Sequence, residues 1–507
     1  MIPSLARSNP IMRRKAEWPE WPPPHQQLSG ALFEPRPSLR RLTVLADAEL
    51  LAEPDDYTLS VRTVLTGLLA HRYVKLLRYR DDGAFPATPR RPYGPPGAGL
   101  SAAEGWAELL PPDGRDGRDL LYADDAGPVL AAVLGHGVQF ARSEVGAAAY
   151  RDLDPPQAAD QRARDALAAE VAQVVGADLF VTERPYLFTT RSSTGRGAAV
   201  CRPADALAMI GLYLRSQGQF IIWNAADGSG SHSMNHGLYY WVGTRELLPT
   251  AWRWFSACVQ ESRAAGDDTL LDLGESLLRR VQRVLESRDR FHQAFNLPQN
   301  NDTARSVLTE LDAVLVSLMG AVDASARVAH HVLGLPRSPH DAAWQRTRWL
   351  TQIAAPQPGL AALFANGTPL HDTLTILRLL RNTVHGQMMR TTIVQSTGRL
   401  RETAVRLPAA DEPTILAAMD ALGGRADWGV RPAARGASLV DPGLFIEQIV
   451  PKVIALLNEA MAATPVERLP HVHLTAVDDQ PPSPRRAGEA DIFGERNRLS
   501  IRWQLGF

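Results

Sequence analysis

The sequence predicts an α/β domain with a parallel sheet, followed in the same chain by an all-α helical bundle. Between residues 41 and 215, short apolar runs alternate with helical patterns, which is typical of a parallel sheet covered by helices. Between residues 300 and 465, apolar residues recur every three or four positions in long segments, which is typical of amphipathic helices. At 507 residues the chain is too long for one ordinary core, so two or three domains are expected.

The composition indicates where in the cell the protein resides more clearly than it indicates what the protein does. The formal net charge is −1, so any binding of nucleic acid must come from local arginine clusters and not from an overall basic field. The two cysteines, Cys201 and Cys258, offer neither a disulfide framework nor a cysteine-based zinc site. No run approaches the ~18 apolar residues of a membrane span, and the N-terminus lacks the apolar segment of a secretory signal. We therefore expect a cytoplasmic protein without a membrane partner.

The first half of the chain reads as an arm and a sheet domain. Residues 1–38 are rich in proline and arginine without periodicity and predict an extended, poorly ordered arm. The predicted α/β domain, residues 41–215, begins with an apolar run that predicts a buried strand ending in Asp47. The same patterns then predict helices over 60–79, 158–175 and 203–217 and a strand over 179–183.

The second half is predominantly helical by periodicity. A connecting region, residues 216–299, carries aromatic and helical segments, and its arginine-rich part, 279–290, predicts a solvent-facing basic stripe. The tail, residues 466–507, is polar and rich in proline, although apolar residues alternate over 499–505 and predict a terminal strand. In the predicted helical domain, residues 300–465, the clearest helices lie over 307–331, 377–386 and 445–463.

Acidic residues stand near the predicted strand ends of the α/β domain. Because the carboxyl ends of parallel strands meet at one edge of a sheet, several acids can converge there on a divalent metal. Hard oxygen ligands suit Mg²⁺ or Mn²⁺, which can activate water against a phosphodiester. The alternative is that these acids are solvated strand ends and helix caps. The candidate metal ligands are Asp47, Glu144, Asp165, Asp178 and Glu183.

Two parts of this domain resemble PIN-like domains. Residues 42–51 look like the first strand of that family and its acid. Residues 165–172 together with 177–184 look like its later helix and strand. The resemblance covers about 41–215, with a large insertion after the first helix, and implies a metal-dependent nuclease site.

The sequence departs from the PIN-like pattern after the last of these strands. The acid of the family usually falls two positions after the strand threonine, where this sequence has Arg184. Glu183 comes one position earlier, and it therefore lies on the other side of an extended strand. Asp47, Glu144 and Asp165 are thus the better candidates for a metal cluster, and a PIN-like fold without activity is the alternative.

The segment Leu377–Gly386 places two arginines, an asparagine and a histidine on an otherwise apolar helix. Arg381 and His385 are one turn apart, and Arg378 is two turns from His385, so all three side chains can share a face. A histidine titrates near neutral pH and can act as general base or acid, while a guanidinium holds a phosphate oxygen. Cleavage of RNA through its 2′-hydroxyl needs both roles and no metal.

A purely structural role is the alternative for this segment. The helix predicted over 307–331 carries Asp312 and Asp323, which are eleven residues apart and therefore face nearly the same way. Either carboxylate can meet Arg381 across a pair of helices. Asn382 would then hydrogen-bond a buried turn.

The three helices within residues 300–465 resemble a HEPN domain, whose family carries an arginine, a polar residue and a histidine in one helix. The resemblance implies a metal-independent ribonuclease with His385 and one arginine as the active pair and Asn382 as the orienting residue. The family usually has four to six residues between arginine and histidine; here six separate Arg378 from His385 and three separate Arg381 from His385. An apolar residue follows Arg378 where the family has a polar one, so the sequence leaves open which arginine is the partner.

These resemblances predict an RNA-binding protein and endoribonuclease that acts on single-stranded or tRNA-like RNA in a stress, toxin or antiphage response. No cofactor is expected at the helical site, whereas Mg²⁺ or Mn²⁺ is expected at the acidic site. A homodimer is compatible with the HEPN resemblance. The alternative from a different class is a non-catalytic scaffold or regulatory protein that uses both folds for binding or dimerisation.

Overall fold

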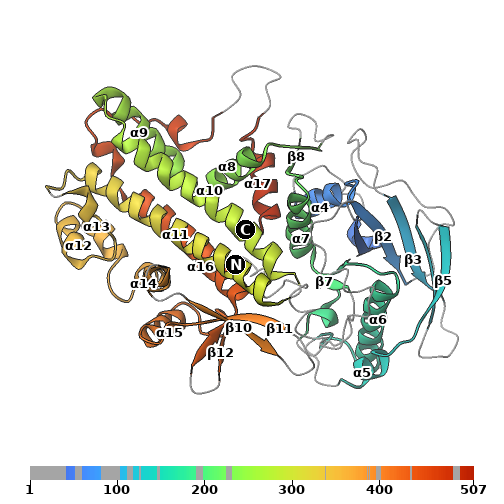
Figure 1. Ribbon diagram of the computed structural model, residues 1–507. Coiled ribbons are helices and arrows are strands. Elements are labelled where there is room, and N and C mark those ends of the chain that lie inside the picture. The colour runs from blue at the N-terminus through green and yellow to red at the C-terminus, as the bar shows by residue number, and fades with distance from the viewer. Residues whose placement is uncertain are drawn as a thin grey trace.

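The structure is a computed structural model in which two layered regions lie side by side (Figure 1). It describes residues 41–51, 60–81, 103–110, 118–124, 127–144, 149–189, 198–223, 231–297, 299–336, 338–384, 386, 389–395, 401–433, 437–482 and 491–507. The predicted arm over 1–38 lies outside the described residues, as does His385.

A seven-stranded sheet in the order β5-β4-β3-β2-β1-β6-β7 forms the centre of the first region. Strand β2 and then β3 lie on one side of β1, and β6 and then β7 lie on the other side. These five strands are parallel. Strands β4 and β5 extend the sheet in antiparallel pairing. The strands are β1 Leu42–Asp47, β2 Val74–Arg80, β3 Ala103–Leu109, β4 Arg118–Asp124, β5 Gly127–Val133, β6 Leu179–Val181 and β7 Ala199–Cys201. The predicted α/β class with a mostly parallel sheet is confirmed.

Helices cover both faces of this sheet, and the alternation of side chains along β1 shows which face is which. Val44 and Ala46 pack in the core shared with α4 (Val61–Leu69) and α7 (Pro203–Ser216). Leu45 packs on the opposite face, in the core shared with α5 (Val138–Ser143) and α6 (Pro155–Val174). Because side chains alternate along a strand, Asp47 follows Leu45 and faces α6.

The helix predicted over 60–79 is wrong in its second half. Helix α4 begins after Ser60, whose hydroxyl oxygen accepts a hydrogen bond from the backbone N–H of Thr63 at 3.1 Å, and it ends at Leu69. A turn then leads into β2, Val74–Arg80. A strand buried on both faces reads as a nearly continuous apolar run, so the apolar residues of β2 continued the helical spacing by coincidence.

The second region is largely helical, as predicted. Its two longest helices, α10 and α11, lie side by side and form the spine of the bundle (Figure 1). The predicted helix over 307–331 lies within α11 and the one over 445–463 within α16, whereas α14 begins before the one predicted over 377–386 and ends at Thr383. The helices are α8 His236–Leu247, α9 Ala251–Ala265, α10 Thr269–Phe295, α11 Asn301–Val332, α12 Thr347–Ala354, α13 Pro358–Leu363, α14 Pro369–Thr383, α15 Glu412–Ala421, α16 Pro442–Ala463 and α17 Glu495–Gln504.

The expectation of an all-α second domain is wrong, because this region also contains a small antiparallel sheet. Its order is β10-β11-β13-β12. The β-branched run Thr391–Val394 explains β10, since such side chains favour a pleated strand over a helix. The strands are β10 Arg390–Gln395, β11 Arg401–Arg406, β12 Val430–Pro432 and β13 Ser438–Val440, and a separate ribbon joins β8 Ile221–Trp223 to β9 Ser231–Ser233.

The terminal strand predicted over 499–505 is wrong, because this segment belongs to helix α17. Ile501 and Leu505, one turn apart, pack into the core of the helical region. Trp503 packs against the core beside α4 and α7. A helix that buries two opposite faces between two partners can show the same alternation as a strand, which explains the error.

Helix α16 has the length and apolarity of a membrane span. Within the described part of the chain, the stretch Pro442–Arg468, which contains α16, is the single candidate of this kind, and 56% of its apolar 18-residue window is buried inside the protein. A buried core helix has the same length and composition, so this stretch does not by itself indicate a membrane span.

Candidate functional site

The carboxyl ends of β1, β2 and β6 lie side by side at one edge of the sheet. At this point β2 follows β1 on one side and β6 lies next to β1 on the other, so the strand order reverses there. This switch point is where open α/β sheets bind their ligands. Asp47 is the last residue of β1, Asp81 follows β2, and Thr182 follows β6. Phe180, two residues before Thr182, packs on the α6 face, so Thr182 also projects to that side.

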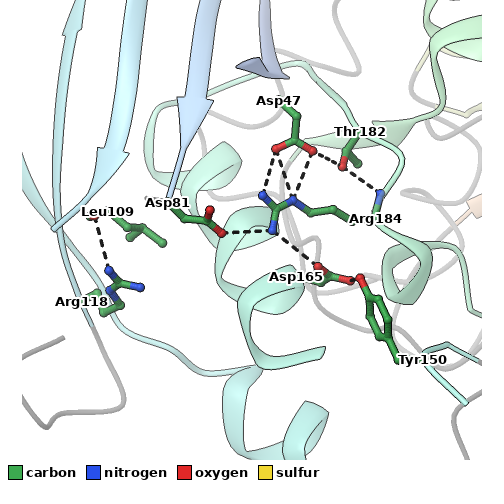
Figure 2. Close-up of polar contacts among 8 residues, drawn as sticks. All are labelled: Asp47, Asp81, Leu109, Arg118, Tyr150, Asp165, Thr182 and Arg184. Atoms are coloured by element: carbon green, nitrogen blue, oxygen red, sulfur yellow. Dashed lines mark hydrogen bonds and ion pairs between the residues drawn. The ribbon is translucent and has the colours of Figure 1, made fainter. Parts of the chain in front are cut away.

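Arg184 lies at the centre of this edge, among three carboxylates (Figure 2). Its Nη2 is 3.1 Å from Oδ1 of Asp47, and its Nε is 3.2 Å from both carboxylate oxygens of Asp47. Its Nη1 is 3.2 Å from Oδ2 of Asp81 and 3.5 Å from Oδ1 of Asp165, which projects from α6. We call these four residues, Arg184, Asp47, Asp81 and Asp165, the Arg184 cluster.

Neighbouring groups fix the cluster from both sides. The Thr182 hydroxyl donates to Oδ2 of Asp47 and accepts from the backbone N–H of Arg184 at 3.1 Å. The Tyr150 hydroxyl donates to Oδ2 of Asp165 at 2.8 Å. Tyr150 has a φ of 61°, the one positive φ at a non-glycine position among the residues described. Such a backbone conformation costs roughly 1–3 kcal/mol and persists only where its surroundings impose it.

Burial and neighbouring charges act in opposite directions on the pKa values of the cluster. Burial raises the pKa of Asp165 to about 6, although the hydrogen bond from Tyr150 and the charge of Arg184 act in the opposite direction. Burial alone would lower the pKa of Arg184, but the carboxylate of Asp47 and its other neighbours raise that pKa. Arg184 is therefore a permanent cation in this site.

The structure brings together two of the five acids predicted as metal ligands, Asp47 and Asp165. Glu144 instead accepts a hydrogen bond from the Tyr186 hydroxyl at 3.0 Å. Asp178 lies at the amino end of β6, the opposite edge of the sheet, and accepts from the backbone N–H of Thr43 at 2.9 Å. Glu183 is exposed. In the described ranges, no group of three or more His, Cys, Asp or Glu residues is placed to hold a metal ion.

The residues at this edge do not fit a divalent metal with Arg184 in place. Mg²⁺ binds carboxylate oxygens at about 2.0–2.1 Å and would stand beside a guanidinium that already contacts both oxygens of Asp47. Two cations sharing one carboxylate in a largely buried site repel each other strongly.

Sequence reasoning missed Asp81, Tyr150 and Thr182 as members of this site. The sequence predicts a helix over the segment before Asp81, so it predicts no strand end at that residue. The signal in the sequence that points to this site is Arg184, a basic residue that follows the strand predicted to end beside the acids.

The second candidate site lies at the C-terminal end of α14. Arg378 and Arg381 are half-buried, and Asn382 is exposed. The Nε of Arg381 is buried and has no hydrogen-bond partner. His385, the fourth residue predicted here, lies outside the described residues.

Asp323, and not Asp312, is the carboxylate of α11 that feels the charge of Arg381. Burial raises the pKa of Asp323, while the charges of Arg327, Arg381 and Arg280 lower it, with a further contribution from Arg346. Burial alone raises the pKa of Asp312.

The charges of arginines from three helices, Arg280 of α10, Arg327 of α11 and Arg381 of α14, therefore act on Asp323. Arg280 of α10 packs directly on Gly320 of α11, where an added Cβ would lie 2.2 Å from the Arg280 Nη1. The Nε of Arg327, like that of Arg381, is buried without a hydrogen-bond partner. We call Asp323, Arg280, Arg327 and Arg381 the Asp323 cluster, in which arginines outnumber the carboxylate.

The protein thus has an α/β sheet region, which carries the Arg184 cluster, joined to a largely helical region, which carries the Asp323 cluster. Comparisons of the chain with protein-family models, with curated proteins and with solved structures give no match.

Proposed function

We propose that the protein binds RNA and cleaves it without a metal ion at the C-terminal end of α14. The observation that carries this proposal is the Arg381 Nε, which is buried without a hydrogen-bond partner in a cluster in which arginines outnumber the carboxylate. Buried donors are normally paired, and the Arg381 guanidinium that carries this unpaired Nε is only half-buried, so we propose that its accessible nitrogens are available to an anionic ligand. A phosphodiester supplies both the acceptor oxygens and the negative charge.

The proposed chemistry divides two tasks between residues of this segment. His385 takes the proton from the RNA 2′-hydroxyl or gives one to the leaving oxygen. Arg381 or Arg378 holds the phosphate oxygens as negative charge develops on them. Asn382, which is exposed, orients the substrate. We propose single-stranded or tRNA-like RNA as the substrate, a homodimer as the working unit, and a cytoplasmic stress, toxin or antiphage response as the setting.

The alternative proposal is a non-catalytic scaffold. It is favoured by the Arg184 cluster, in which the carboxylates at the switch point of the sheet already contact a guanidinium from within the chain. A HEPN-like bundle and a PIN-like sheet can both be retained as binding or dimerisation modules.

The test is to incubate the purified protein with mixed single-stranded RNA, with and without EDTA. We expect cleavage that resists EDTA and falls about 10²–10⁴-fold in His385→Ala, the usual contribution of a general acid or base. Parallel assays of Arg378→Ala and Arg381→Ala decide which arginine is the partner. Arg283→Ala is the matched control, because Arg283 is an exposed arginine of α10 and its loss should leave cleavage unchanged.

Two results would contradict this proposal. Cleavage that requires a divalent metal and is lost in Asp47→Asn would move the activity to the sheet edge. Absence of cleavage in both conditions, with RNA binding and folding intact, would favour the scaffold.

A further inference from the structure

We infer that Arg184 serves as a built-in cation at the carboxyl edge of the sheet, replacing a divalent metal that the acids would otherwise need. This inference concerns the α/β region and does not depend on RNA cleavage at α14. Three acids from separate elements converge on one point, and the group at that point is the Arg184 guanidinium (Figure 2).

The origin of the three carboxylates explains why a cation is needed there. Asp47 ends β1, Asp81 follows β2, and Asp165 projects from α6, so the fold itself forces them together. Asp165 has a fully buried side chain, and that of Asp47 is only 12% exposed. Carboxylates held close together with little solvent repel one another and require an opposing charge.

The geometry of Arg184 meets this need with a single side chain. Its Nε and Nη2 engage both oxygens of Asp47, and its Nη1 faces Asp81 and Asp165. A guanidinium is planar and always charged, and its five N–H groups can serve several carboxylates at once. Its carbon also lies 5.4 Å from the centre of the Tyr79 ring, which adds a cation–π contact from β2.

The interactions of Asp47 leave little room for a metal. Its Oδ2 accepts from the Thr182 hydroxyl as well as from Arg184, and its Oδ1 accepts from two nitrogens of Arg184. A metal would have to displace these donors from a carboxylate that lies next to a permanent cation. The thermal stability of the wild-type protein should therefore not change when a divalent metal is added. The stability of a variant without Arg184 should depend on the metal.

The test measures thermal unfolding of the full chain in EDTA and in millimolar Mn²⁺. The wild-type Tm should be the same in both conditions. In Arg184→Ala the Tm should fall by several degrees in EDTA and recover in Mn²⁺. The three carboxylates contact the guanidinium and are not placed to hold a metal in the wild type, so the recovery requires them to close on the ion in the space that Arg184 leaves. The double variant Arg184→Ala/Asp47→Asn should lose that recovery.

Arg162→Ala is the matched control for the loss of a buried arginine. Arg162 is a buried residue of α6 whose Nε donates to the carbonyl oxygen of Ala141 at 2.8 Å, outside the Arg184 cluster. Its Tm should fall to the same extent with and without Mn²⁺. If Arg184→Ala is unchanged in Tm, or falls equally in both conditions, the inference is wrong.

Direct Mn²⁺ titration of the wild-type protein by calorimetry decides the matter even if Arg184→Ala fails to fold. No heat of binding that depends on Asp47 is expected. Binding that is present in the wild type and lost in Asp47→Asn would overturn the inference, because it would show that a metal occupies this edge despite Arg184.

Discussion

Glu447→Ala is expected to lower the free energy of unfolding by about 3–5 kcal/mol, the usual effect of removing one partner from a buried ion pair. Glu447 of α16 accepts from Arg288 Nε at 3.0 Å and from Arg288 Nη2 at 2.7 Å, and its Oε1 lies 2.6 Å from His292 Nε2. The side chains of Arg288 and Glu447 are 2% and 3% exposed. Without the carboxylate, the Arg288 charge would remain buried between α10 and α16.

Urea unfolding followed by circular dichroism measures this loss, with Glu459→Ala as the matched control. Glu459 is an exposed glutamate of the same helix, so its replacement should change stability by less than about 0.5 kcal/mol. Equal effects of the two variants would contradict the role assigned to Glu447.

The dependence of stability on pH provides a second measurement of the same pair. Burial alone would raise the pKa of Glu447, but Arg288 and His292 together lower it from its usual 4.5 to about 2. A carboxyl group with a lowered pKa in the folded state stabilises the fold fully above about pH 4.5, and this stabilisation is lost as pH falls toward 2. The wild type should therefore lose more stability than Glu447→Gln between these two pH values.

The buried arginines show which part of the structure the sequence could not predict. The segment 279–290 was expected to be a solvent-facing basic stripe, and Arg279, Arg283 and Arg290 are indeed exposed. Arg288 and Asp289, however, are buried, each with 2% of its surface exposed. The spacing of apolar residues predicts which face of a helix is buried. It cannot show that Asp289 pairs with an arginine 74 positions away or that Arg288 pairs with a glutamate 159 positions away.

The same distinction holds for the candidate site at the sheet edge. The convergence of Asp47 and Asp165 was predictable, because it follows from strand direction and from the alternation of side chains along β1. The participation of Asp81 was not, because β2 is buried on both faces and therefore lacks the alternation that identifies a strand. The position of Arg184 between the acids depends on the pairing of residues 137 positions apart, which no local pattern encodes.

Arg215→Ala is expected to have a comparable effect, about 3–5 kcal/mol, and to uncouple the two regions of the protein. Arg215 lies on α7 beside the sheet, and its Nη2 donates to Oδ1 of Asp289 on α10 at 3.0 Å. The Tyr240 hydroxyl donates to Oδ2 of the same carboxylate at 2.6 Å. Arg215 Nη1 also donates to the carbonyl oxygen of Gln504 in α17 at 3.0 Å. One side chain thus ties the sheet region, the bundle and the helix between them.

Hydrogen exchange measured by mass spectrometry gives the protection of backbone amides in the two cores separately, and it therefore tests this coupling. In the wild type, peptides from β1 and α11 should become unprotected together as urea is added. In Arg215→Ala, protection of β1 should be lost at lower urea than that of α11, because an Asp289 that has lost its counter-charge at the boundary favours separation of the regions. Arg202→Ala, at an exposed position before α7, should keep the two losses coincident. Coincident losses in Arg215→Ala as well would show that apolar contacts of α17, chiefly Ile501, Trp503 and Leu505, suffice to hold the regions together.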